Sequence, residues 1–343
     1  MIGLLFTVLN SLEKNLINCM GHQNAPMVIS IVTSIMHLGI CHLLTYNFEL
    51  GIKAPPIATA IYLFNQFIVL HLYIKFFVKD EKVQEAWILP SKSSFNVNGL
   101  IEYLRIGIPS IGVLCLDWWS FEIMMIFASG LSVQAVAVQV LIITTGATFF
   151  MIHVGISISS GILVGQNIGA LKVKQAKIFC NLTQLIALAN AFINSSIIYI
   201  FSAELASLYT KDPDLKALTK TGLEFFAFFA LSDANKANGT GIMRGLALMN
   251  PLSLIVFISY YLISPPFEYL FAYTCSFDVR GIWAGQLVGA LFHLGSQLYY
   301  IYVKCDWNMI AIESHERIER DKKIVAQEGG GPPAVGLEMK NIH

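Results

Sequence analysis

Residues 106–130 read IGIPSIGVLCLDWWSFEIMMIFASG, an apolar stretch that two carboxylates, Asp117 and Glu122, interrupt near its middle. The stretch is long enough to cross the hydrocarbon core of a bilayer as a helix, which needs about 20 residues. An acid at the centre of a spanning helix costs roughly 2.5–3.5 kcal/mol, so such residues usually face a cavity or a partner. Trp118 and Trp119 lie between the two acids and add aromatic surface. The stretch therefore predicts a membrane helix that contributes to a binding site for amphipathic cations.

The whole chain is too apolar for a water-soluble protein of its length. Of its 343 residues, 55% are hydrophobic and 13% are charged, and the mean hydropathy is +0.63. Eight stretches approach the length of a span and lack the polar alternation of barrel strands; they lie at residues 26–47, 55–77, 106–130, 135–158, 178–201, 222–243, 250–274 and 281–303. Residues 1–9 form an apolar stub without a signal-peptide cleavage site. We predict an all-α fold, a polytopic membrane helix bundle with eight full spans plus this stub.

Basic residues gather on one side of the predicted topology. They occur in the loop after the second span, in the loop after the fourth span and at the start of the C-terminal tail: Lys75, Lys79, Lys82, Lys92, Arg105, Lys172, Lys174, Lys177 and Lys304. The positive-inside rule therefore places these loops and the tail in the cytoplasm. The formal net charge is zero, which gives no electrostatic basis for binding nucleic acid.

The chain also contains a weak internal repeat. Residues 21–26 begin one span and Gly51 precedes the next, and residues 245–251 and Gly281 begin a similar pair about 225–230 positions later. Internal repeats of this kind are a common transporter design. Three full spans precede the repeat in the second half, whereas only the stub precedes it in the first. We therefore expect an N-terminally truncated chain, with an unusual single-bundle variant as the alternative.

An ordered set of motifs resembles a known family. Residues 109–122, with Pro109-Ser110 and then Cys-Leu-Asp-Trp-Trp-Ser-Phe-Glu, are similar to the seventh spanning helix of eukaryotic multidrug and toxic compound extrusion (MATE) transporters, which carry Cys-Leu-Glu-Trp-Trp-x-x-Glu. Further matches follow in the family's order, at Val164–Ala170, Asp233, Gly241, Arg244-Gly245, Tyr260-Tyr261, Pro266 and Gly281-Ile-Trp-x-Gly285. The similarity covers residues 10–303, from the end of the family's fourth helix through its twelfth. It implies part of a twelve-helix, two-bundle MATE fold.

This sequence departs from the family pattern at several positions. Asp117 replaces the usual Glu, His153 stands where Pro is frequent, and Ser264 stands where Gly is usual. Gln139 lies near a position that bears an acid in some animal members. The missing first three helices are the larger departure, because the family's N-terminal bundle lines half of the central cleft.

We predict four regions along the chain. Residues 1–80 form the remainder of the N-terminal bundle, residues 81–105 a cytoplasmic inter-bundle loop, residues 106–303 a six-helix C-terminal bundle, and residues 304–343 a cytoplasmic, partly disordered tail.

Three acids within predicted spans are candidate substrate-binding or proton-binding residues: Asp117, Glu122 and Asp233. Asp117 and Glu122 are about 140° apart around a helix, so we expect them to do different jobs. Lys236 follows Asp233 by almost one turn, and a local ion pair would explain Asp233 without transport. Structural acids that bond neighbouring polar side chains are the alternative for the other two.

Aromatic residues form the second group of candidates. Trp118 and Trp119 point about 100° apart, so at most one of them faces a cleft squarely. A desolvated organic cation gains about 2 kcal/mol or more over such a ring, although packing against lipid is the commoner role of a membrane Trp. Tyr260 is a weaker candidate, because aromatic residues near span ends also anchor helices at the interface. A small-x-x-x-small ridge predicts close helix packing at Gly161, Gly165 and Gly169.

These candidates suggest an exchange mechanism. Burial favours the protonated form of a carboxylate and a nearby cation favours the ionised form, so one site can hold a proton or an organic cation in turn. The resemblance implies the same proton-coupled antiport. We predict a monomeric secondary transporter that exports organic cations or other xenobiotics by alternating access, with protons or Na⁺ as the coupling ion and no cofactor. Plasma, vacuolar and other vesicular membranes are all compatible.

Two other functions stay open. A transport-inactive, truncated fragment with a packing or regulatory role would also carry these motifs. A membrane enzyme is disfavoured, because the histidines form no metal or acyl-transfer motif and the six cysteines include no C-x-x-C pair.

Overall fold

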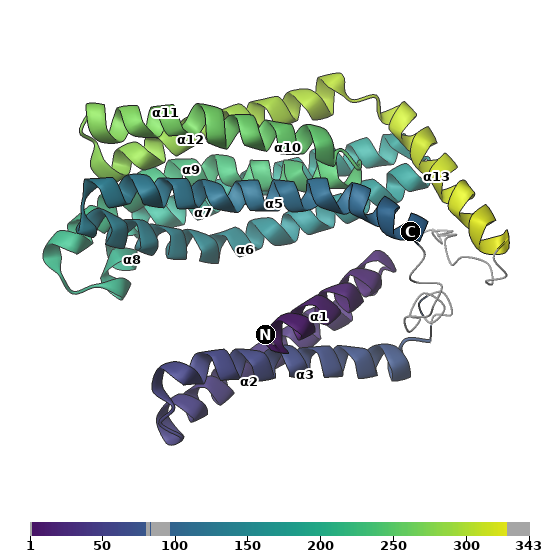
Figure 1. Cartoon of the computed structure of the whole chain (residues 1–343), viewed down its shortest axis with the longest axis horizontal. Helices are drawn as coiled ribbons and strands as arrows, with labels where there is room; N and C mark the ends of the chain where they lie inside the picture. The colour runs from purple at the N-terminus through teal and green to yellow at the C-terminus, as the bar shows by residue number, and fades with distance from the viewer. Residues whose placement is uncertain (1, 80–82, 84–96, 328–343) are drawn as a thin grey trace. The chain divides into compact units, whose positions relative to one another are not determined.

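The computed structural model describes residues 2–79, 83 and 97–327 (Figure 1). The chain divides into two compact units, residues 1–94 with 322–343 and residues 95–321. All described elements are helical, which confirms the predicted all-α class. Apart from Val83, residues 81–96 of the predicted inter-bundle loop lie outside the described residues, as do residues 328–343 of the predicted disordered tail.

The N-terminal unit contains three long helices. These are α1 (Ile2–Cys19), α2 (Asn24–His42), which continues through a π-helical turn (Leu43–Asn47), and α3 (Ala54–Phe77), which follows a 3₁₀ turn (Gly51–Lys53). Pro55 and Pro56 stand in the first turn of α3, where a missing N–H breaks no helical hydrogen bond. Helix α3 packs against both α1 and α2. Residues 2–9 of the predicted stub therefore form the first part of a longer helix.

This unit buries a narrow apolar seam and exposes the rest of its surface. Ile17, Leu70 and Ile74 are fully buried, and Gln66 accepts a hydrogen bond from Asn10 across α1 and α3. On α2 only Pro26, Ile29 and Thr33 are buried, so most of its apolar side chains face outward. Outward apolar side chains suit a lipid environment, because lipid tails are as apolar as the side chains themselves.

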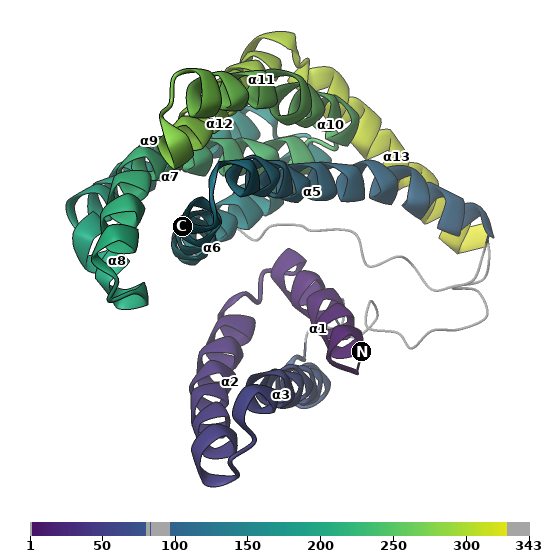
Figure 2. The ribbon, with the colours of Figure 1, turned by 60° about the vertical axis from the view of Figure 1, so that its left-hand side comes forward.

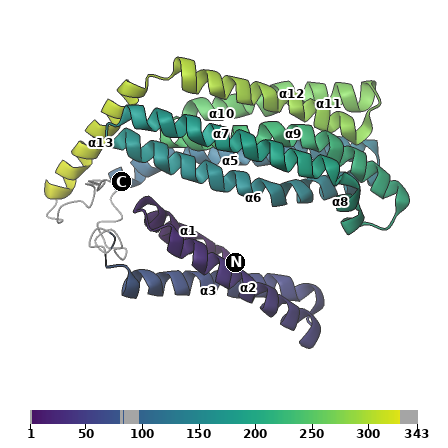
Figure 3. The same cartoon turned by 180° about the vertical axis from the view of Figure 1, so that it is seen from behind.

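The second unit contains several long helices, most of which run side by side in Figures 1 and 2, together with shorter ones. Its helices are α5 (Val97–Leu131), α6 (Val133–Gly169), α7 (Val173–Ile200), α8 (Ser202–Tyr209), α9 (Pro213–Gly245), α10 (Met249–Phe257), α11 (Ser264–Tyr269), α12 (Asp278–Tyr299) and residues 307–321 of α13 (Trp307–Gln327). Helices α10 and α11 are joined by a π-helical turn (Ile258–Ile263), and similar turns follow α11 and α12. Helices α6 and α7 pack against each other, and Figure 3 shows them side by side in a view from behind.

Helix α9 is the central element of this unit, since it packs against α6, α7, α8 and α12. Small residues allow the approach of α6: a Cβ on Gly241 would lie 2.0 Å from the carbonyl oxygen of Ser157, and a Cβ on Gly245 would lie 2.5 Å from that of Gly161. Gly165 also faces Gly245. Gly169, the third member of the predicted ridge, lies instead beside Ile318 of α13.

Among the described residues, six helices are long and apolar enough to cross a membrane. They correspond to the predicted spans at 26–47, 55–77, 106–130, 135–158, 178–201 and 250–274. The predicted spans within α9 and α12 are not among the six, and the predicted count of eight is not confirmed. Helix α9 carries a run of buried polar residues that explains its lower apolarity: Ser232, Asp233, Asn235, Lys236 and Asn238.

Candidate functional site

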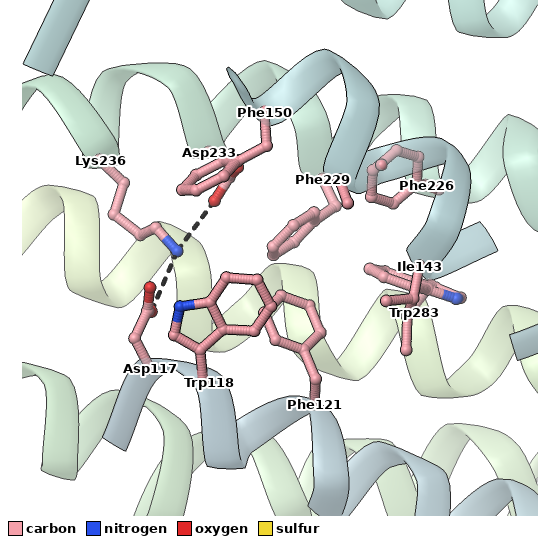
Figure 4. Close-up of a pocket in the computed structure, with 12 residues that line it drawn as sticks. Asp117, Trp118, Phe121, Ile143, Phe150, Phe226, Phe229, Asp233, Lys236 and Trp283 are labelled. Carbon is pink, nitrogen blue, oxygen red and sulfur yellow. Dashed lines mark hydrogen bonds and ion pairs between the residues drawn. The ribbon is translucent and has the colours of Figure 1, made fainter. Parts of the chain in front are cut away.

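Two carboxylates hold one ammonium group inside the second unit (Figure 4). The Nζ atom of Lys236 lies 2.8 Å from Oδ1 of Asp233 and 3.3 Å from Oδ1 of Asp117. Asp233 and Lys236 are three residues apart on α9, which places them on one face of the helix, and Asp117 comes from α5. The side chain of Lys236 is 4% exposed, that of Asp233 11% and that of Asp117 26%. We call these three residues the charged triad.

Aromatic rings and a histidine surround the triad. The ammonium lies 5.2 Å from the ring centre of Tyr260 and 5.8 Å from that of Phe229, both within cation–π range. Nδ1 of His153 on α6 lies 3.8 Å from the second carboxylate oxygen of Asp233. Nδ2 of Asn194 lies 2.9 Å from Nε2 of His153. Because an amide NH₂ group only donates, this contact assigns the proton of a neutral His153 ring to Nδ1, on the side of Asp233.

An aromatic pocket begins at the triad, as Figure 4 shows. Its apolar lining includes six rings, Trp118, Phe121, Phe150, Phe226, Phe229 and Trp283. The rings of Phe226 and Phe229 lie edge-on to Trp283 at 4.8 and 5.4 Å between centres. The volume of about 50 Å³ is far below the roughly 300 Å³ of a usual ligand pocket. A drug-sized ligand therefore requires side chains of this pocket to move.

A second, larger pocket lies on the other side of the triad. It has a volume of about 330 Å³ and extends along α9 to Thr240 and Arg244. We call it the Arg244 pocket. The two pockets share four lining residues, Asp117, Trp118, Phe150 and Lys236. The contact between Asp117 and Lys236 therefore stands between the two cavities.

The structure brings together four of the six predicted binding residues. Asp117, Asp233 and Trp118 line the aromatic pocket, and Tyr260 lies against Lys236. Tyr260 sits on the π-helical turn after α10, a distortion that is frequent at functional sites. Its ring is buried, and its hydroxyl has no hydrogen-bond partner among the described residues.

Glu122 and Trp119 lie elsewhere on α5. Neither residue lines the aromatic pocket or the Arg244 pocket. Both are exposed on the second unit, and Trp119 is 60% exposed. Asp117 and Glu122 thus have different surroundings, in line with their spacing of five residues.

Sequence reasoning treated Lys236 only as a possible ion-pair partner of Asp233, and that ion pair is present. Its second partner, Asp117, lies 119 residues earlier and on another helix, so no local pattern indicated the contact. His153 had a weak signal, since it stands where the MATE pattern often has Pro. Within the described ranges, no group of three or more His, Cys, Asp or Glu side chains is arranged to hold a metal ion.

The fold and this site define a class: a polytopic helical membrane protein with charged residues buried between its helices, as transporters have. Comparison with known proteins then shows what this chain is similar to. The MatE family model matches residues 109–270. "Multidrug and toxin extrusion protein 1" of Xenopus tropicalis is 27% identical over 319 residues, covering 89% of this chain and 54% of the relative. "Protein DETOXIFICATION 14" of Arabidopsis thaliana is 26% identical over 300 residues, covering 87% of this chain and 61% of the relative.

Solved structures show the same fold. The crystal structure of the eukaryotic MATE transporter AtDTX14 matches with a TM-score of 0.78 at 23% identity, covering 85% of this chain and 65% of that one. An outward-facing MATE transporter of the MOP superfamily matches with a TM-score of 0.67 at 16% identity, covering 94% and 67%. These matches confirm the predicted resemblance: in sequence and in fold, this chain is similar to eukaryotic MATE transporters. It spans about half to two-thirds of the length of the relatives it matches.

Proposed function

We propose that this chain supplies the C-terminal cation site of a secondary active transporter that exports organic cations or other xenobiotics in exchange for protons. The observation that carries the proposal is a buried ammonium held by Asp117 and Asp233 beside an aromatic pocket. The site already binds one cation of the protein's own. The names of the relatives, which describe multidrug and toxin extrusion, support the same kind of substrate.

The chemistry of the site suits an exchange. A carboxylate of the triad gains from a proton or from an organic cation but little from both, so each displaces the other. The six rings of the aromatic pocket offer faces to the apolar body of such a cation. If the two access states differ in affinity for proton and substrate, the exchange drives alternating access. The proton is the proposed coupling ion, and Na⁺ is the alternative that the same oxygen ligands could accept.

The placement in the membrane is part of the proposal. Lys172, Lys174 and Lys177 lie at and just after the turn between α6 and α7, and Lys304 lies at the end of the turn after α12. We propose that these residues and the C-terminal tail face the cytoplasm. In the same proposal, residues 1–80 and 106–303 belong to two bundles of one monomeric transporter in the plasma membrane or a vesicular membrane.

Proteoliposome uptake tests this function. Tetraethylammonium uptake should follow an imposed pH gradient, and Asp117→Asn and Asp233→Asn should each reduce it strongly. Asp214→Asn on the exposed first turn of α9 is a matched control that should leave uptake unchanged. Gradient-insensitive uptake, or equal uptake by all four proteins, would contradict the proposal.

A second candidate is a transport-inactive chain that packs with a longer relative. The chain covers only part of the length of its relatives, 54% for the Xenopus protein, and this partial coverage is the observation that supports the alternative. Uptake by the purified chain alone excludes it. The alternative would be established by two results: the purified chain by itself shows no uptake, and adding it to a reconstituted full-length relative changes the uptake by that relative.

A further inference from the structure

Lys236 occupies the position that the proposed function gives to the exchanged cation. We propose that Lys236 is a tethered competitor for Asp117 and Asp233, which restricts the site to organic cations whose apolar body also fills the aromatic pocket. The inference rests on the proposed function and adds to it a residue that determines specificity.

The ammonium of Lys236 is well satisfied where it lies. It has three N–H donors, and it lies within 2.8 and 3.3 Å of two carboxylate oxygens and close to the faces of Tyr260 and Phe229. These are the groups that would bind a free ammonium ion or an organic cation. An incoming cation therefore finds its ligands already in use.

The charge of the site supports this competition. Asp117 on α5 and Asp233 on α9 face Lys236 directly, so the triad carries two negative charges and one positive charge. The other titratable groups around it include Tyr260, His293 of α12 and, beside Asp233, His153 of α6. Tyr261 lies near Asp117, and Arg244 lines the Arg244 pocket. The net charge of the triad is therefore −1. The site can accept one further cation if the ammonium of Lys236 loses its contact with one of the two carboxylates.

Asp117 is the partner that can be exchanged. Its contact with Lys236 is longer than that of Asp233, 3.3 against 2.8 Å, and its side chain is more exposed, 26% against 11%. Asp233 and Lys236 are also fixed three residues apart on one helix, whereas Asp117 lies on another. Asp117 borders both pockets, so a ligand can reach it from either cavity.

Competition of this kind selects by ligand type. A small alkylammonium ion gains a contact with a carboxylate, but Lys236 loses the same contact. The gain and the loss in free energy largely cancel. An aromatic cation gains in addition from burial against the rings of the pocket. Its binding requires side chains of the aromatic pocket to move, because the cavity holds only about 50 Å³. Trp118 lines both pockets and is 48% exposed, so it has room to do so.

A purely structural role for Lys236 is the opposing explanation, in which the ammonium only joins α5 to α9. The two explanations differ in a measurable way. A structural clamp, once removed, lowers stability without improving a cation site. A competitor, once removed, leaves two buried carboxylates that bind small cations more tightly.

The experiment measures binding by the full chain in lipid nanodiscs, with tetramethylammonium and tetraphenylphosphonium as probes. The wild type should bind tetraphenylphosphonium and only weakly tetramethylammonium. Lys236→Met should bind tetramethylammonium at least about tenfold more tightly, as the coupling energies of close charge pairs imply, with a smaller gain for tetraphenylphosphonium. Lys236→Arg should keep the wild-type preference. Lys220→Met is the matched control and should change neither affinity; Lys220 is exposed on the same helix and pairs there with half-buried Glu224.

A further variant guards against misfolding of Lys236→Met. The double variant Asp117→Asn with Lys236→Met restores the net charge of −1 and leaves Asp233 without a tethered cation. It should also bind tetramethylammonium more tightly than the wild type. If folded Lys236→Met, or this double variant, binds both probes no better than the wild type, Lys236 is not a competitor, and the transport proposal stands. If no protein binds either probe, the proposed cation site itself is wrong. Tighter binding without transport in liposomes would contradict only the transport function.

Discussion

Helices α2 and α9 are both components of a predicted membrane bundle, yet they are built in opposite ways. Helix α2 is mostly apolar and contains no Asp, Glu, Lys or Arg, and only three of its 19 residues are buried within its unit. Helix α9 buries 18 of its 33 residues, and the buried set includes Asp233, Lys236 and two asparagines. Of the two, only α2 meets the length and hydropathy criterion for a span. The helix that fails this criterion is the one that carries Asp233 and Lys236, whereas α5, which carries Asp117, meets it.

The difference has a physical cause. A helix that faces lipid needs apolar side chains on its surface, whereas one surrounded by other helices can satisfy polar groups through its neighbours. Asn235 accepts a hydrogen bond from Gln184 of α7, and Asn238 donates one back to the same side chain. Close packing is required for such contacts. On the side of α6, the glycines of α9 and α6 make such close packing possible.

The largest expected effect tests this packing. Gly241→Ala would place a Cβ 2.0 Å from a backbone oxygen of α6, which cannot move without shifting the helix. We expect a loss of about 3 kcal/mol or more in the free energy of unfolding. Thermal unfolding in detergent measures it. Gly39→Ala on α2 and Gly155→Ala on α6 are controls with no atom within 4 Å of the added carbon. Equal melting temperatures for all three variants would show that α9 is not packed as described.

The sequence alone predicted the class of fold and part of the site. The run of residues 109–122 indicated a membrane helix with functional acids, and the spacing of Asp117 and Glu122 indicated that they differ. The spacing of glycines on α6 indicated close packing, but not which helix would lie opposite each one. These features are local, because they follow from residues one to five positions apart on one helix.

The contact between Asp117 and Lys236 could not be predicted in this way. It depends on the rotation of α5 and α9 about their own axes, which side chains across the whole bundle determine. The same holds for the division between Trp118 and Trp119, since a helical pattern says only that the two rings point apart. Sequence reasoning stopped where tertiary packing decides between equivalent faces.

An intermediate effect distinguishes these two tryptophans. Trp118→Ala removes a ring from the aromatic pocket, and we expect the affinity for tetraphenylphosphonium to fall about 5- to 30-fold, the equivalent of about 1–2 kcal/mol. Trp119→Ala changes the exposed side of the same helix and should alter the affinity less than about twofold. Equal losses in the two variants would contradict the assignment of the aromatic pocket as the aromatic contact site that distinguishes the two rings.

The smallest effect concerns Tyr260, whose ring and hydroxyl have different surroundings. The ring lies 5.2 Å from the ammonium of Lys236, whereas the buried hydroxyl has no hydrogen-bond partner among the described residues. Removing an unsatisfied hydroxyl loses no bond, so Tyr260→Phe should shift the melting temperature by no more than about 1–2 °C. Tyr260→Leu removes the aromatic face and should cost about 1–2 kcal/mol more. If Tyr260→Phe destabilises the protein as much as Tyr260→Leu, the hydroxyl holds a partner such as ordered water. The polar interior around α9 would then extend beyond the charged triad to the turn after α10.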